Sequence, residues 1–250
     1  MIRWLILILC LAMPLRAEEV VADLSQNRIA ITANFDGSQI TVYGAVRREA
    51  PVPAGDLHVI VTVEGPSTPV TVRRKSRVMG VWINTDAARI TRAPVFYALA
   101  TTGNLPQILS ETEDLRHRIS INRAIRDVGL ASMVEDSPGF VEALIRLNRR
   151  AGNYHTDEGA VSLIRDTLFR ADFALPANLT EGLFRVRIFL LRDGAVLDHQ
   201  SEVIDVHKAG LERFLHRLAY DQPLIYGLLS LVLAVAAGWG ASAAFRAFRP

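Results

Sequence analysis

The sequence contains one cysteine, Cys10, which lies in the apolar N-terminal segment. If that segment is removed as an export signal, the remaining chain has no thiol. Disulfides, thiolate metal ligands and a cysteine nucleophile are then excluded, because each needs a cysteine sulfur. The body must therefore be stabilised by burial of its side chains.

The chain also lacks a strong charge of either sign. The formal net charge is +2, 22% of the residues are charged and 50% are hydrophobic. Nucleic-acid binding needs a concentrated basic face, so we expect no nucleic-acid partner. This composition is typical of folded domains, and 250 residues suffice for one large or two small domains.

Sequence motifs of catalysis and metal binding are absent. The chain has no Gly-x-Ser-x-Gly elbow, no phosphate-binding loop and no dinucleotide fingerprint. Six histidines occur, none at the spacing of metal ligands: His58, His117, His155, His199, His207 and His216. We therefore predict no catalytic residues, no cofactor and no metal, and we expect the protein not to be an enzyme.

The N-terminal segment has the pattern of a secretory signal. Arg3 precedes an apolar stretch from Leu5 to Met13, which is too short to span a bilayer. A small residue, Ala17, follows at a suitable cleavage position. We predict a signal peptide over residues 1–17, cleaved after Ala17; the alternative is an uncleaved anchor or a buried helix.

A second apolar segment lies near the C-terminus. Pro223 precedes a run from Leu224 to Phe245 that contains no charged residue. About 20 apolar residues cross the hydrocarbon core of a membrane. Arg246 and Arg249 follow the run, and positive charge favours the cytoplasmic side. We predict a transmembrane helix over residues 223–245 and a cytoplasmic tail over 246–250, with the body outside.

Small residues recur at every fourth position of this helix. Such spacing places them on one helix face, where another helix can approach closely. The predicted partner is an integral membrane protein or a second copy of the chain; the alternative is that small residues are simply common in such helices. The two sets are Ala234, Gly238 and Ser242, and Ala236, Gly240 and Ala244.

The body has the pattern of short β-strands. From residue 18 to residue 104 apolar and polar residues alternate, most clearly in Leu57–Glu64. A second β-rich part covers residues 168–207, where Asp193-Gly194 indicates a hairpin turn. In this part Arg185 and Arg187 oppose the apolar face of a strand. The fold prediction is mainly β, as immunoglobulin-like antiparallel sandwiches with a helical insert.

The helical insert is predicted over residues 105–167. Ser137-Pro138 is typical of a helix start, and Gly152 of a helix end. A second short helix is predicted from Glu158 to Thr167. Residues 208–222 are predicted to form a juxtamembrane amphipathic helix that leads into the span.

A basic run is the most conspicuous polar feature of the body. We expect its residues to bind an anion or lipid headgroups. The alternative is that these charges prevent another strand from pairing with the edge of this one. Trp82 and Phe96-Tyr97 follow nearby, and we interpret them as core residues of the first β-rich part, with a contact patch as the alternative. The basic residues are Arg73, Arg74, Lys75 and Arg77.

Three stretches of the chain carry a family resemblance. They lie within residues 24–44, within residues 74–98, where Gly80-Val81-Trp82-Ile83-Asn84 stands out, and within residues 168–184. With both apolar ends, the chain resembles the alphaproteobacterial family described as "putative transmembrane protein". The resemblance implies a bacterial inner-membrane protein facing the periplasm, with a transporter as one conceivable partner. It supplies no catalytic residues.

Two functions are consistent with these features. The first is a non-catalytic periplasmic module, anchored by one helix, that binds or steadies a membrane partner. The second is an enzyme or ligand-binding domain whose site assembles from distant residues, because a sandwich fold does not exclude either.

Overall fold

The computed structural model describes residues 18–32, 35–49, 51–125, 137–208 and 218–247. The chain divides into two units. The first, residues 1–29 and 36–206, contains the body; the second, residues 30–35 and 207–250, contains the C-terminal helix. The predicted signal peptide lies outside the described residues, as do residues 209–217 of the predicted juxtamembrane helix. Residues 218–221 are helical.

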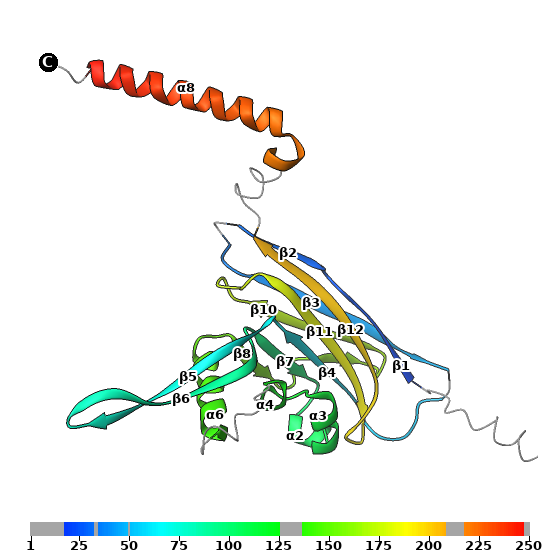
Figure 1. Ribbon diagram of the computed structural model, residues 1–250. Coiled ribbons are helices and arrows are strands. Elements are labelled where there is room, and N and C mark those ends of the chain that lie inside the picture. The colour runs from blue at the N-terminus through cyan, green and yellow to red at the C-terminus, as the bar shows by residue number, and fades with distance from the viewer. Residues whose placement is uncertain (1–17, 33–34, 50, 126–136, 209–217, 248–250) are drawn as a thin grey trace, which may run out of the picture. The chain divides into compact units, whose positions relative to one another are not determined.

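The body contains two larger sheets and one two-stranded ribbon (Figure 1). One sheet has the strand order β1-β3-β10-β9, the other β2-β12-β11-β4-β7-β8, and the ribbon is β5-β6. The bounds are β1 (Glu18–Leu24), β2 (Arg28–Ile31), β3 (Ser38–Arg48), β4 (Leu57–Glu64), β5 (Ser67–Val78), β6 (Val81–Pro94), β7 (Tyr97–Thr101), β8 (Tyr154–Asp157), β9 (Ser162–Ile164), β10 (Leu168–Leu175), β11 (Gly182–Arg192) and β12 (Ala195–Lys208).

Both larger sheets combine strands from before and after the helices. β10 pairs with β3, and β11 pairs with β4, antiparallel in each case. The prediction of a mainly β chain is confirmed. One pair departs from the expected antiparallel arrangement, because β8 runs parallel to β7.

Besides the helical residues 218–221, five helices are described. Four belong to the segment predicted to be helical: α2 (Leu105–Ile108), α3 (Glu111–His117), α4 (Ile121–Ala124) and α6 (Ser137–Arg150). α6 begins at Ser137 as predicted, and Gly152, with φ of +74°, follows its end. The fifth helix is α8 (Pro223–Ala247) in the second unit.

The prediction of a short helix from Glu158 to Thr167 is wrong. Residues Ser162–Ile164 form β9, which pairs with β10 through a tight turn. Arg165 and Asp166 both adopt φ of +51° in this turn, a left-handed conformation that ends any right-handed helix. Pairing with β10 therefore decides the structure of a segment whose local pattern suits a helix.

The predicted turn between β11 and β12 is confirmed. Asp193 has φ of +51° and Gly194 φ of +79°, as in a two-residue hairpin loop with left-handed torsions. Along β11, Phe184, Val186 and Ile188 are fully buried on one face. Their neighbours Arg185 and Arg187 point to the opposite face, as the alternation predicts.

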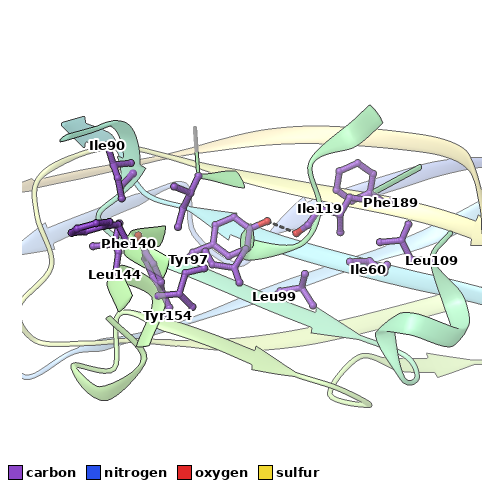
Figure 2. Close-up of a cluster of buried hydrophobic side chains, with 14 of the residues drawn as sticks. Ile60, Ile90, Tyr97, Leu99, Leu109, Ile119, Phe140, Leu144, Tyr154 and Phe189 are labelled. Carbon is purple, nitrogen blue, oxygen red and sulfur yellow. Dashed lines mark hydrogen bonds between the residues drawn. The ribbon is translucent and has the colours of Figure 1, made fainter. Parts of the chain in front are cut away.

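Helices and strands enclose a cluster of buried apolar side chains (Figure 2). Phe140 and Leu144 of α6 pack in this cluster with Tyr97 of β7. The hydroxyl of Tyr97 donates a hydrogen bond to the carbonyl of Ile119 at 2.5 Å. Phe96 and Tyr97 are each 1% exposed, so their interpretation as core residues is confirmed.

A buried ion pair fixes the start of β1. The Glu18 carboxylate accepts two hydrogen bonds at 2.9 Å from Nη2 of Arg192 and one at 2.7 Å from Nε of Arg48. Burial raises the pKa of Glu18, but these hydrogen bonds outweigh burial and hold it below its ordinary value. Arg192 also donates to the carbonyls of Pro53 and Gly55.

Side chains of β12 bind the backbone of β1, which belongs to the other sheet. Asp198 accepts a hydrogen bond from the backbone N–H of Val20 at 3.0 Å. The amide of Gln200 bonds to both backbone groups of Ala22, at 2.8 and 2.9 Å. These contacts satisfy backbone groups at the edge of the first sheet and connect the two sheets.

Candidate functional site

The first candidate region is α8. It has 25 residues, is apolar around its whole circumference, and has no acidic residue in its first turn. In the described part of the chain it is the one helix long and apolar enough to cross a membrane. The hydroxyl of Ser230 donates a hydrogen bond to the backbone carbonyl of Tyr226, so it needs no water molecule as a partner inside a membrane. This helix agrees with the predicted span of residues 223–245.

The small residues of α8 leave its backbone accessible. A side chain added at Gly238 or Gly240 would meet no other atom of the chain within 4 Å. Ala234, Ala236 and Ser242 are exposed as well, and the side-chain environment of Ala244 lies outside the description. Within the unit that contains α8, the two predicted packing faces are therefore open along 234–242.

The second candidate region is the ribbon β5-β6, which projects from the body (Figure 1). Its base is held by apolar contacts, because Val72, Ala88 and Ile90 are buried with Phe140 and Leu144 of α6. Arg74 lies over the Phe140 ring, 4.6 Å from its centroid. The distal half beyond Arg74 is exposed on both faces.

The end of the ribbon is apolar, and we call Val78–Ile83 the ribbon tip. Met79 is fully exposed, Trp82 is 65% exposed and Val81 63%. Val78 pairs with Val81, so both lie on one face, and Trp82 pairs with Arg77 on the other. The interpretation of Trp82 as a core residue is therefore wrong, because the ribbon extends past the elements that cover its base.

The predicted basic residues flank this tip. Arg73, Lys75 and Arg77 are exposed along β5, whereas Arg74 points to α6. From residue 73 to residue 86 the ribbon carries four basic residues and one acidic residue, Asp86. Exposed basic residues of β5 thus lie beside an exposed apolar end, and we call Arg73, Lys75 and Arg77 the basic collar.

The third candidate region is a cavity of about 340 Å³ in the body, which we call the arginine pocket. It lies where strands β4, β5, β6 and β11 meet the end of α3 and α4. Five arginines and one glutamate line it: Arg92, Arg116, Arg118, Arg185, Arg187 and Glu64. Ser67, His117 and Ala124 complete the described lining. The described lining therefore carries a large excess of positive charge.

Neighbouring groups partly compensate this charge. Arg116 pairs with Glu113 at 2.6 Å, and Arg185 lies 4.0 Å from Glu64. Arg187 instead donates to two backbone carbonyls, those of His117 at 2.6 Å and Arg118 at 3.0 Å. Arg187 thus has hydrogen bonds, but no carboxylate of the described residues lies within ion-pair distance of it.

His117 lies beside the arginines, and its Nε2 is 3.3 Å from the Glu113 carboxylate. Burial lowers the pKa of its imidazole, and the neighbouring His199, Arg116 and Arg187 lower it further, against the opposing effect of Glu113. The ring centroids of His117 and His199 are 5.4 Å apart. Within the described ranges, no three histidine, cysteine or acidic side chains are placed to hold a metal ion.

Comparison with known proteins identifies the family. Residues 19–247 match the family described as "Putative transmembrane protein (Alph_Pro_TM)". The chain belongs to this family. Its membership and the apolar helix α8 together make it a membrane-associated protein, as the resemblance of the sequence predicts.

Comparisons beyond the Alph_Pro_TM family add little. The structure of Spo0M, a sporulation control protein from Bacillus subtilis, is similar at a TM-score of 0.26 and 12% identity. The similarity covers 77% of this chain and 50% of Spo0M, so the chain spans half the length of that relative. At this TM-score the likeness carries no argument. A search of curated proteins found no match.

The sequence of this Alph_Pro_TM chain predicted some residues of the three candidate regions and not others. Sequence reasoning found the small residues of α8 and the basic run, it named a contact patch at Trp82 only as the alternative to a core position, and it missed the arginine pocket. The signal for the pocket was present in β11, where Arg185 and Arg187 alternate with buried residues. Arg92, Arg116 and Arg118 come from distant elements, and no local pattern links them to β11.

Proposed function

We propose that this protein is a membrane-anchored accessory module whose body lies in the periplasm and which binds or steadies an integral membrane partner. A transporter is one candidate partner, and a second copy of the chain is another. The observation that supports the proposal best is α8, which is uncharged from Leu224 to Phe245 and has small residues along two open faces. Close helix approach at such residues stabilises association in lipid.

Export and orientation belong to the same proposal. Residues 1–17 act as a signal peptide cleaved after Ala17. Arg246 and Arg249 then lie in the cytoplasm, and the anchor is in the bacterial inner membrane. The body would be an immunoglobulin-like sandwich, a proposal supported by two sheets that contact each other at β1 and β12.

Bulky substitutions in α8 test the partner. We expect Gly238→Leu or Gly240→Leu to reduce recovery of the partner at least severalfold in mild-detergent co-purification, because leucine separates the two helices. Trp239→Leu is the control, because Trp239 lies midway between the two small-residue sets on the helix circumference. Equal recovery with all three variants, or full function of the body without α8, would refute the helix contact.

The ribbon provides a second contact, with anionic lipid at the membrane surface. Tryptophan favours the membrane interface, and each lysine or arginine near an anionic surface contributes about 1 kcal/mol. The ribbon tip and its basic collar combine both features in one exposed element. An isolated two-stranded hairpin is only marginally stable in water, so such a contact also explains how its distal half is maintained.

Fluorescence of Trp82 tests this contact in the full chain. In a variant with Trp4→Phe and Trp239→Phe, Trp82 is the one remaining tryptophan. In vesicles of anionic phospholipid we expect blue-shifted emission and quenching by brominated acyl chains. Replacing Arg73, Lys75 and Arg77 with glutamine should remove most of the quenching, whereas glutamine at Arg146, Arg149 and Arg150 of α6 should not.

Two results would contradict the lipid contact. Emission typical of water with no quenching would show that the tip stays in solvent. Equal quenching in neutral vesicles would show that the basic collar has no part in it. A protein strand added to an open edge of the ribbon would then be the favoured occupant.

The second function, a ligand-binding domain, is favoured by the arginine pocket. A cavity rich in guanidinium groups is a binding feature. We therefore propose binding without catalysis for the body.

A further inference from the structure

The arginine pocket has the composition of an anion site. Five guanidinium groups surround a cavity of about 340 Å³, and Glu64 is the one carboxylate in its described lining. No carboxylate of the described ranges lies within ion-pair distance of Arg92, Arg118 or Arg187. Like charges brought this close repel one another, so the arrangement gains stability from a bound anion.

Arg187 gives the strongest indication of a missing anion. Its guanidinium is held by the carbonyls of His117 and Arg118, yet its Nε is buried and has no hydrogen-bond partner among the described residues. Arg187 is only partly buried, but removing its Nε from water has a cost that a nearby negative charge would offset. The two carbonyl oxygens accept hydrogen bonds from Arg187, but they carry only partial negative charges and neutralise only part of the guanidinium charge.

A second buried polar group lies beside Arg187. Thr62 of β4 pairs directly with Arg187 of β11, so the two side chains share one face of the sheet. The Thr62 hydroxyl is fully buried and also has no described hydrogen-bond partner. Unsatisfied buried groups of this kind are uncommon in proteins and point to a ligand or water.

The end of α3 holds the pocket in a fixed geometry. Arg118 adopts a left-handed conformation, with φ of +53°, as the cap of this helix. The Asp114 carboxylate stabilises the turn by accepting hydrogen bonds from the backbone N–H groups of Ile119 and Ser120, at 3.0 and 2.7 Å. The site is therefore formed before any ligand binds, which lowers the cost of binding.

We propose that the arginine pocket binds a small oxyanion: sulfate, phosphate or the phosphate group of an ester. The planar fork of arginine matches the oxygens of these anions with paired hydrogen bonds. The lining is mostly polar and charged, which disfavours an apolar ligand. The cavity accommodates one such group with its hydration.

Calorimetric titration of the full-length protein in neutral maltoside micelles tests the proposal. The probes are sulfate, inorganic phosphate and glycerol 3-phosphate, each at constant ionic strength against chloride. The last presents the phosphate ester of a lipid headgroup, so its preference over the inorganic ions distinguishes the two sources. Saturable binding of one anion per chain is expected.

Matched variants locate the site. Arg92→Gln and Arg185→Gln are each expected to weaken binding about tenfold, because each removes a charge-assisted hydrogen bond. Arg146→Gln removes an equal charge from an exposed position on α6 and should change binding less than twofold. The melting temperature of each variant verifies that it is folded. Absence of saturable binding for all three anions, or equal weakening by the control, would overturn the proposal.

Discussion

Replacing Arg192 with leucine is expected to lower the free energy of unfolding by about 3–5 kcal/mol. The side chains of Arg192 and Glu18 are 6% and 2% exposed, so their charges are shielded from water. Removal of the arginine leaves the carboxylate buried with Arg48 as its one remaining cation. It also leaves the carbonyl of Pro53 without this donor. Urea denaturation followed by circular dichroism measures the loss.

A surface ion pair supplies the control for this substitution. Arg170 and Asp172 pair at 3.1 Å with exposed side chains, and Arg170→Leu should cost less than about 1 kcal/mol. The double variant Glu18→Leu with Arg192→Leu should recover part of the loss, because no buried carboxylate remains and Arg48 keeps its hydrogen bonds to Thr167 and the Asp166 carbonyl. A cost for Arg192→Leu no larger than that of the control would show that the pair is dispensable.

The same ion pair imposes a pH dependence. The pKa of Glu18 is lowered from 4.5, so the unfolded chain binds more protons than the folded one in this range. Stability from Glu18 is therefore present above pH 4.5 and is lost as the pH falls through the folded pKa. In Arg192→Leu this acid sensitivity should weaken.

Charging the centre of α8 is expected to release the chain from the membrane. Each arginine near a bilayer centre costs about 2.5–3.5 kcal/mol, so Leu231→Arg, Val232→Arg and Val235→Arg together cost about 8–10 kcal/mol. All three side chains are exposed on a helix that is apolar on every side. Flotation with liposomes in a density gradient measures the retained fraction.

Isoleucine at the same three positions is the matched control and should leave flotation unchanged. Continued flotation of the arginine variant would contradict α8 as the anchor. If mass spectrometry then found residues 1–17 still attached, that N-terminal segment would be the anchor, and the predicted cleavage after Ala17 would be wrong.

The ribbon illustrates where pattern reading fails. Alternation along β5 and β6 indicates strands, but it does not tell whether either face meets another element. Trp82 lies beyond the reach of α6 and is exposed, whereas Ile90, on the same strand, is fully buried. The sequence between them carries no mark of this boundary.

The sequence alone determined the apolar helix near the C-terminus, the two-residue period of the strands and the turn at Asp193-Gly194. These depend on the length of an apolar run and on neighbouring residues. Only the tertiary structure decided the pairing of Ser162–Ile164 with β10, the exposure of Trp82 and the convergence of five arginines on one cavity. These depend on contacts between distant segments, because the energy of burial and pairing is shared by residues that no local pattern connects.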